Sequence, residues 1–318
     1  MILLLGVMGL IVADLFKRPS REQENPEMYS IEKLKMIDTS QICFREVKHF
    51  KTDMSALQGL ALDLNLNVYV CGDRDVQVYN RDWEKTSGFR VDSDAYCIAP
   101  GAGGEIYLGL GDHIEVFDLS GVRKAKWNAY NDPSFLTSIV VIGDEVFAAD
   151  AENKVVLRYD REGSLLNTIG KKDRENGIDG FIIPSMYFDV AVGPDNELWI
   201  ANTGRHELQR FSLDGKLISF WGTASMQLEG FAGCCNPVHF AIMPDGQFVT
   251  YEKGLDRIKL YNQAGEYACT VSGPVYTDEK SLASCSVSSP VHDLAVDREG
   301  RVYALDGEKL LIRVFISK

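Results

Sequence analysis

Short stretches of alternating apolar and polar residues recur along most of the chain. Each stretch contains an apolar strand, a turn at Gly or Asp, a second strand, a polar turn and a third strand that ends in an aromatic residue. The clearest copy spans residues 188–215, and close echoes begin at Val238 and Val291. Alternation with a period of two, broken by turn residues at regular intervals, predicts a chain built of β-strands.

Six copies of this unit align on the aromatic residue of the third strand. The aromatic residues are Tyr79, Phe117, Tyr159, Phe211, Tyr261 and Phe315, and the matching apolar positions of the second strands are Val68, Ile106, Val146, Leu198, Phe248 and Val302. The aromatics lie 38 to 54 residues apart, close to the repeat length of propeller blades. A small sheet cannot cover both of its faces, so the copies must pack around an axis. The pattern predicts an all-β, six-bladed β-propeller.

The two ends of the chain are expected to meet in one blade. The sequence ends at Lys318, directly after the third strand of the sixth copy. That blade lacks an outer strand, and residues 42–50 form a strand-like stretch that no copy uses. We expect this N-terminal strand to complete the sixth blade and close the ring, which removes an exposed sheet edge.

The first 13 residues are apolar without a break, and Lys17 and Arg18 follow soon after. This run is shorter than the roughly 20 residues of a spanning helix, so residues 1–18 are interpreted as a short membrane-anchor helix or a signal-like segment. A buried N-terminal helix is the alternative. Residues 19–40 are polar and are expected to form a linker, followed by the propeller at residues 41–318. We expect a membrane-anchored, extracytoplasmic protein, although Lys17 and Arg18 favour a cytoplasmic body by the positive-inside rule.

Composition and charge narrow the partners. Of 318 residues, 45% are hydrophobic and 25% are charged, which is typical of a globular protein with a large core. The formal net charge is -13, and nucleic-acid binding rests largely on Lys and Arg, so we exclude a nucleic-acid partner. We expect a monomeric propeller. The sequence contains no Gly-x-Ser-x-Gly elbow, no His-Glu-x-x-His and no phosphate-binding loop.

A longer motif lies in the fourth copy. Residues 200–222 form a strand that ends in Asn-x-Gly and continues into a polar, His-containing and then apolar run. This stretch resembles the NHL repeat, and the resemblance implies a six-bladed propeller that is either a binding module or, in a smaller set of relatives, an enzyme with a metal in the central channel. The polar position after the second strand is occupied in four copies by Asp150, Asn202, Glu252 and Asp306. We expect a side-chain oxygen there to accept hydrogen bonds from turn amides, and His206 to brace the same turn.

The start of each innermost strand should point into the central channel. The residues at these positions are Gln58, Tyr96, Thr137, Phe188, Val238 or His239, and His292, with Asp189 and Asp293 one residue further on. We take Gln58, Tyr96, His239, His292 and Asp293 as candidate ligand-binding residues. Because imidazole and carboxylate groups suit divalent ions, His239, His292 and Asp293 form a candidate site for Zn or Ca. The alternative is that both histidines only hydrogen-bond to backbone in a filled channel.

The chain has seven cysteines, an odd number that cannot all pair with one another. Cys234, Cys235 and Cys285 fall in loops that enter innermost strands. We expect a disulfide between two of these loops, or a thiol site if the residues are reduced. Cys71 and Cys97 lie in apolar strands and are expected to be small core residues.

Two functions are consistent with this sequence. Long loops at residues 170–184, 222–237 and 273–290 should lie on one face near the channel mouth, and loops carry binding more often than strands do. The first hypothesis is a binding or scaffold module that holds a protein or a small-molecule ligand on this loop face at a membrane. The second is a metal-dependent lyase or hydrolase, whose channel metal would polarise a carbonyl or activate water.

Overall fold

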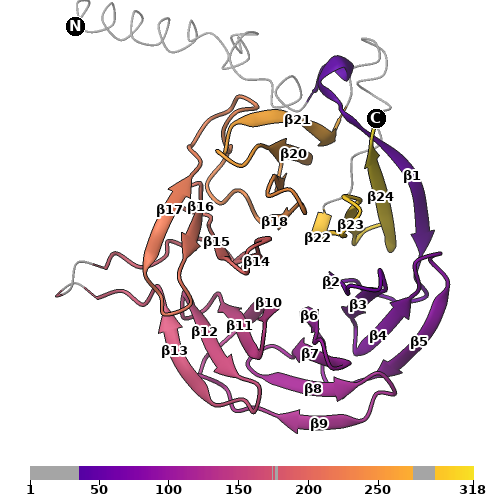
Figure 1. Ribbon diagram of the computed structural model, residues 1–318, viewed down its shortest axis with the longest axis vertical. Coiled ribbons are helices and arrows are strands. Elements are labelled where there is room, and N and C mark those ends of the chain that lie inside the picture. The colour runs from indigo at the N-terminus through magenta and orange to yellow at the C-terminus, as the bar shows by residue number, and fades with distance from the viewer. Residues whose placement is uncertain (1–35, 174, 176–177, 275–290) are drawn as a thin grey trace, which may run out of the picture. The chain divides into compact units, whose positions relative to one another are not determined.

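The computed structural model describes residues 36–173, 175, 178–274 and 291–318. Within these residues, 24 strands form six four-stranded antiparallel sheets arranged around a central axis (Figure 1). One short 3₁₀ turn, η1 (Thr39–Gln41), precedes the first strand. The all-β, six-bladed propeller predicted from the sequence is therefore confirmed.

Each blade is a meander of four strands, of which the first lies nearest the axis and the last lies at the rim. Blade one contains β2 (Gly59–Leu62), β3 (Val68–Gly72), β4 (Asp75–Tyr79) and β5 (Lys85–Arg90). Blade two contains β6 (Cys97–Pro100), β7 (Glu105–Gly109), β8 (Ile114–Asp118) and β9 (Arg123–Lys126). Blade three contains β10 (Leu136–Ile142), β11 (Glu145–Asp150), β12 (Val155–Asp160) and β13 (Leu165–Ile169).

The second half of the ring follows the same plan. Blade four contains β14 (Val190–Val192), β15 (Leu198–Asn202), β16 (Glu207–Phe211) and β17 (Leu217–Trp221). Blade five contains β18 (His239–Ile242), β19 (Phe248–Glu252), β20 (Arg257–Tyr261) and β21 (Tyr267–Ser272). Blade six contains β22 (Val291–Val296), β23 (Val302–Asp306), β24 (Leu311–Ser317) and, as its outer strand, β1 (Phe44–Lys51).

The second and third strands pair in the same register in all six blades. The facing residues are Val68 and Tyr79, Ile106 and Phe117, Val146 and Tyr159, Leu198 and Phe211, Phe248 and Tyr261, and Val302 and Phe315. The core lies between neighbouring blades. The Trp127 ring, for example, is buried with its centroid 5.7 Å from that of Tyr107 and 5.1 Å from that of Tyr159 in the next blade. Burial of such rings stabilises the stacking of one blade on the next.

The N-terminal strand closes the ring as expected. β1 pairs antiparallel with β24 along its length, so both ends of the described propeller share blade six (Figure 1). A disulfide between Cys43, just before β1, and Cys269 in β21 also ties this strand to blade five. The sequence alone assigns neither cysteine to a disulfide, because it does not show that the closing strand lies beside blade five.

The polar residues at the ends of the second strands accept backbone N–H bonds, in three blades from the loop that enters the blade as well as or instead of from the predicted turn. Asp150 accepts from Phe135 N–H at 3.2 Å, Asn202 from Ile182 N–H at 2.9 Å, Glu252 from Ala232 N–H at 2.8 Å and Asp306 from Lys309 N–H at 2.9 Å. The second and third of these bonds hold the loops at residues 170–184 and 222–237 against the same end of blades four and five. These two long loops therefore share one face, at the end where the innermost strands begin. Most of the third, at residues 273–290, lies outside the described residues.

The N-terminal segments are described only in part. Residues 1–18, expected to be an anchor helix, lie outside the described residues, as does most of the 19–40 linker. At the described end of the linker, Ile37 is buried and its N–H donates to the Pro274 carbonyl at 2.9 Å. None of the helices in the described part of the chain is long and apolar enough to cross a membrane. The boundaries of the first two segments stay predictions.

Candidate metal centre

One position at the start of the innermost strand is equivalent in all six blades. Its occupants, from blade one to blade six, are Gly59, Cys97, Ser138, Asp189, His239 and Asp293. Blades one to three carry small, uncharged residues there, whereas blades four to six carry two carboxylates and an imidazole. The ionisable groups at this position therefore lie on one side of the axis, on three consecutive blades.

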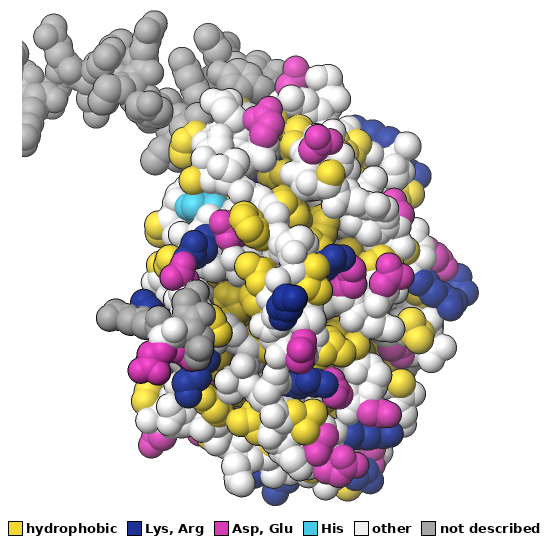
Figure 2. Space-filling view, turned by 60° about the vertical axis from the view of Figure 1, so that its left-hand side comes forward, with side chains coloured by type: hydrophobic (Ala, Val, Ile, Leu, Met, Phe, Trp, Pro, Cys, Tyr) yellow, Lys and Arg dark blue, Asp and Glu magenta, His cyan; other side chains and the backbone are white. Residues whose placement is uncertain are grey.

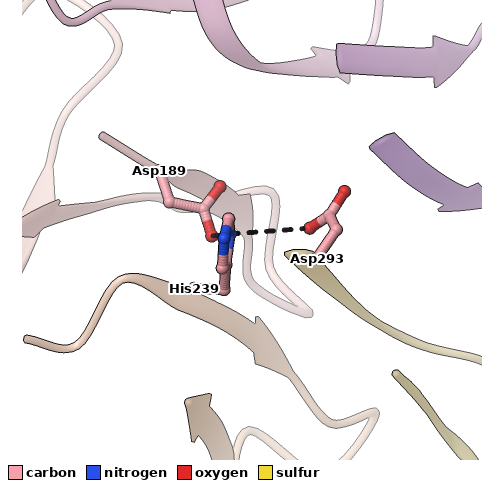
Figure 3. A group of neighbouring side chains, drawn as sticks. All are labelled: Asp189, His239 and Asp293. Carbon is pink, nitrogen blue, oxygen red and sulfur yellow. Dashed lines mark ion pairs between the residues drawn. The ribbon is translucent and has the colours of Figure 1, made fainter. Parts of the chain in front are cut away.

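These three ionisable side chains converge at the axis (Figure 3). His239 Nδ1 lies 3.8 Å from Asp189 Oδ2 and 3.9 Å from Asp293 Oδ1. One ligand atom from each residue can be chosen so that all three lie within 4.8 Å of one another. The side chains are 8%, 13% and 22% exposed for Asp189, His239 and Asp293, so the cluster is largely buried but not sealed from solvent.

Both carboxylates are fixed by backbone amides. Asp189 accepts from its neighbour Val190 N–H and from Phe240 N–H of blade five, each at 2.9 Å. Asp293 accepts in the same way from Leu294 N–H and from Leu60 N–H of blade one, each at 2.8 Å. Such amides lie on the free edge of an innermost strand, where the sheet offers no ladder partner. The bonds orient each carboxylate and leave part of its acceptor capacity for a ligand.

The imidazole of His239 is held mainly by packing. Its ring meets the Tyr187 ring edge-on, with centroids 5.9 Å apart. Nε2 is buried and has no hydrogen-bond partner among the described residues. If His239 only filled the channel, its ring nitrogens should hydrogen-bond to backbone groups. The buried Nε2 makes no such bond among the described residues.

Burial and mutual charge perturb the protonation of the cluster. Burial raises the pKa of Asp293 to about 7; the charge of Asp189 adds to this, while His239 opposes it. Burial alone would lower the pKa of His239, but the interaction with Asp189 and the charge of Asp293 outweigh it and raise that pKa. Both shifts favour the protonated forms of Asp293 and His239, and a cation that binds there must displace protons from these two groups.

The donor set fits a divalent ion. Two carboxylates and one imidazole are ligands for Zn and similar divalent ions. Three protein ligands leave a coordination position open, which is the arrangement of catalytic rather than structural sites. Ligating carboxylates in proteins are themselves hydrogen-bonded by outer groups, as Asp189 and Asp293 are by the backbone amides.

The structure brings together only part of the residue set expected from the sequence. His239 and Asp293 meet, and the third member is Asp189, which the sequence placed at this level but not in the ligand set. His292 lies where the pairing of β22 with β23 shifts register, and its side chain is outside the described residues. A signal for Asp189 was present, because Asp-Val-Ala-Val, His-Phe-Ala-Ile and Asp-Leu-Ala-Val align at residues 189, 239 and 293.

Gln58 and Tyr96 lie one residue before the equivalent position. Their N–H groups donate to the carbonyls of Cys71 and Gly109, and both side chains are half-buried. The Tyr96 ring packs edge-on against Phe135, with centroids 4.8 Å apart. Neither residue belongs to the cluster of three, and their role in ligand binding stays a prediction.

The remaining candidates separate into structural and unassigned groups. Cys71 and Cys97 are buried core residues, as expected. His206 Nδ1 lies 3.1 Å from the Asn236 carbonyl, in line with a bracing role. Cys285 lies outside the described residues, so the expected disulfide to Cys234 or Cys235 stays a prediction.

Comparison with known proteins shows the fold. No protein-family model and no curated protein matches this chain. A streptogramin B lyase structure is similar with a TM-score of 0.56 and 14% identity, covering 84% of this chain and 81% of the other. Virginiamycin B lyase from Staphylococcus aureus is similar with a TM-score of 0.53 and 13% identity, and the match covers 85% of this chain and 88% of the other. A protein of unknown function from Bacteroides thetaiotaomicron is similar with a TM-score of 0.58 and 13% identity, and the match covers 86% of this chain and 72% of the other. At these identities the likeness establishes a six-bladed propeller and no more.

Proposed function

We propose that this protein is a metal-dependent lyase or hydrolase whose divalent ion is held by Asp189, His239 and Asp293. The observation that carries the proposal is the convergence of three ligand atoms, from three consecutive blades, within 4.8 Å of one another. A filled channel needs no such set, and the other three blades place Gly59, Cys97 and Ser138 at the same position.

In this proposal the protein supplies the ligands that hold the ion, their orientation and their negative charge. When bound, the ion would polarise a carbonyl or phosphoryl oxygen or make a water molecule more acidic. Asp189 and Asp293 hold their orientation through backbone amides of the neighbouring blades. Burial raises the pKa of Asp293 to about 7, so this carboxyl must lose its proton when the ion binds, and binding should weaken as the pH falls below neutral.

The substrate would reach this site from the long-loop face, because β14, β18 and β22 begin there. A small-molecule ligand is therefore proposed in preference to a large one. Three similar structures are named as lyases, and one of them, from Staphylococcus aureus, is a catalytically inactive histidine-to-alanine variant with quinupristin. These names fit a histidine-dependent propeller enzyme, but the cluster in this chain is what supports the proposal.

We place this activity outside the cytoplasm. The disulfide between Cys43 and Cys269 supports an oxidising compartment, because structural disulfides are rare in reducing ones. Residues 1–18 would then act as a membrane anchor or signal, and the chain would be a monomeric propeller of the NHL-repeat type.

Calorimetric titration of the full chain with Zn²⁺, and separately with Ca²⁺, tests the proposal. We expect one ion per chain. Replacing an outer partner of a metal ligand costs 10–100-fold in affinity, so His239→Ala should weaken binding by more than about tenfold. His239→Ala is preferred over changes at the two aspartates, because those carboxylates also hold backbone amides.

His113→Ala is the matched control. His113 lies on blade two between Asp112, at 2.6 Å, and Glu115, at 3.4 Å, so it too is an imidazole beside two carboxylates. Its loss should leave the titration unchanged. Absence of binding by the wild type, or equal affinity in the wild type and His239→Ala, would exclude the metal centre.

A second candidate function, the binding module, is favoured by the outer strand of blade four. Leu217, Ile218 and Phe220 of β17 are 43%, 50% and 58% exposed. A groove of about 1000 Å³ lies beside this strand and is lined in part by Phe181, Phe211 and Phe220. Figure 2 shows hydrophobic side chains on this side of the molecule in patches between charged residues of both signs. An exposed apolar edge suits addition of an extended peptide strand from a partner protein.

Peptide display against the wild type and Phe220→Asp separates this function from the first. Peptides with alternating apolar residues should be enriched on the wild type and lost on the variant. Leu165→Asp, on the outer strand of blade three and 43% exposed, is the control that should retain them. Equal enrichment on all three proteins, or none on the wild type, would rule out a strand-binding edge.

A further inference from the structure

Two adjacent cysteines lie on the long-loop face, in the loop that enters blade five. Cys234 Sγ and Cys235 Sγ are 3.5 Å apart, so both side chains turn to the same side although the residues are neighbours. Cys234 is exposed, whereas Cys235 is 5% exposed. One sulfur is thus open to solvent and the other is sheltered directly behind it.

The loop around this pair is tied to blade five by its next residue. The Asn236 amide donates to the carbonyls of Ala232 at 2.6 Å and Lys253 at 3.1 Å, and its oxygen accepts from Lys253 N–H at 2.8 Å. The Asn236 carbonyl also meets His206 at 3.1 Å. Asn236 is 3% exposed, so these bonds are sheltered from water and hold the two sulfurs at a fixed separation.

A buried ionic cluster anchors the first half of the same loop. Glu252, which binds Ala232 N–H, is fully buried together with Lys259 and Arg257. The Lys259 ammonium donates to the carbonyl of Leu228 at 3.0 Å and also to that of Gly230. Buried hydrogen bonds therefore fix the loop to blade five at both of its ends.

The surroundings of the inner thiol favour its ionised form. Burial alone would raise the pKa of Cys235, but Ser185, Cys234 and Lys253 together outweigh it and lower that pKa. Lys253 Nζ is held 4.3 Å above the Tyr187 ring, which keeps the cation at this place. The Ser185 hydroxyl is buried and has no partner that satisfies hydrogen-bond geometry, so it is available to a sulfur or to a bound group. A thiolate is the form of cysteine that binds metals and reacts.

The spacing of the two sulfurs favours a chelate over a disulfide. Neighbouring Cα atoms are about 3.8 Å apart, below the roughly 4.4–6.8 Å that disulfides need, so a bond between adjacent cysteines is strained. A metal or metalloid atom that bonds to both sulfurs avoids this strain, because the sulfurs can stay about 3.5 Å apart. Cys71 and Cys97 do not compete for such a ligand, because both are buried in the core.

We propose that Cys234 and Cys235 form a two-thiolate site for a soft, thiophilic ion or metalloid, with Lys253 beside it and Cys234 as the point of entry. Thiolates bind soft ions such as Cu(I) in preference to hard ions such as Ca. The site does not use the axial carboxylates as ligands. Binding replaces the two thiol protons. With a trivalent arsenical R–As=O, two As–S bonds form and the oxygen leaves as water with both protons, without any change in oxidation state.

Phenylarsine oxide is the first probe, used on the full chain without reductant so that the Cys43–Cys269 disulfide is kept. Native thiol titration of Cys285→Ser, which removes the cysteine outside the described residues, should find Cys234 and Cys235 reactive, with Cys71 and Cys97 silent until the protein is denatured. Phenylarsine oxide should block both reactive thiols. The block should survive excess mercaptoethanol and be removed by a dithiol, because two-sulfur adducts resist monothiols.

Single variants are the matched controls. Added to Cys285→Ser, the changes Cys234→Ser and Cys235→Ser should each leave one reactive thiol, yet lose the monothiol-resistant block. Lys253→Met should slow the native thiol reaction at pH 7 several-fold, while Lys216→Met, at an exposed lysine on blade four, should not. Competition with a chromogenic Cu(I) chelator should then show one Cu(I) per wild-type chain and at least tenfold weaker retention in either serine variant.

Three results would overturn the proposal. The first is a native titration that finds one fewer reactive thiol in the wild type than in Cys285→Ser, which would place one member of the pair in a disulfide with Cys285. The second is a phenylarsine oxide block that mercaptoethanol removes from the wild type. The third is Cu(I) retention that is equal in the wild type and both serine variants.

Discussion

Replacing both Cys43 and Cys269 with serine removes a covalent link between the ring-closing strand and blade five. The two residues are 226 positions apart, so the bond spans nearly the whole propeller. The chain-entropy relation gives about 5 kcal/mol for a loop of that length, as an upper estimate. For a domain of this size 1 kcal/mol corresponds to roughly 2–4 °C, so we expect Tm to fall by on the order of 10 °C. The hydrogen bonds between β1 and β24 remain, so the variant should still fold.

Scanning calorimetry of the wild type, the double variant and the reduced wild type measures this effect. The reduced wild type should melt near the double variant, because both lack the same bond. Cys234→Ser serves as a control for loss of a cysteine elsewhere and should melt within about 1 °C of the wild type. A double variant that melts with the wild type, or mass spectrometry showing Cys43 alkylated in native protein, would refute a structural disulfide and remove the support for an oxidising compartment.

Two further predictions concern ring closure and pH. Deleting residues 42–50 should abolish the cooperative melt, whereas deleting residues 1–30 should leave it within a few degrees; equal melts for the two deletions would contradict closure by β1. Asp293 has a pKa near 7 in the fold and about 4 when unfolded, and the pKa of His239 is also raised. Both groups bind protons more tightly when folded, so the stability that they contribute is complete at low pH. The Asp293 contribution is lost as the pH rises from about 4 through 7, and the His239 contribution only as the pH rises above the ordinary histidine pKa. The unfolding free energy of the wild type minus that of Asp293→Asn should therefore decrease between pH 5 and pH 8. A difference that stays constant over this range would refute the raised pKa of Asp293.

The repeat could be predicted because the hairpin imposes its period on the sequence. Val68 faces Tyr79 just as Phe248 faces Tyr261, and a strand register fixes such spacing whatever the rest of the blade does. The closing strand was predicted for a similar reason, since one blade was left incomplete. The equivalent axial position could have been found by aligning the alanines two residues beyond Asp189, His239 and Asp293.

Other features depend on how blades lie beside one another, which one-dimensional spacing does not encode. The contact between Cys43 and Cys269 arises because the outer strand of blade six passes that of blade five. Nothing in the sequence distinguishes the buried Lys259 from an exposed lysine in a strand. Its carbonyl partner Leu228 lies 31 residues earlier in the chain and is found only in the structure. The convergence of Cys234 and Cys235 depends likewise on the bonds of Asn236, which bend the loop locally.

The most direct test of the axial centre is anomalous diffraction from crystals of the full chain grown with Zn²⁺ or Mn²⁺. We predict one strong peak at the channel mouth, within bonding distance of Asp189, His239 and Asp293, and its disappearance in His239→Ala crystals. Crystals that show no peak at the axis in either metal, or a peak that persists unchanged without the His239 imidazole, would contradict the account.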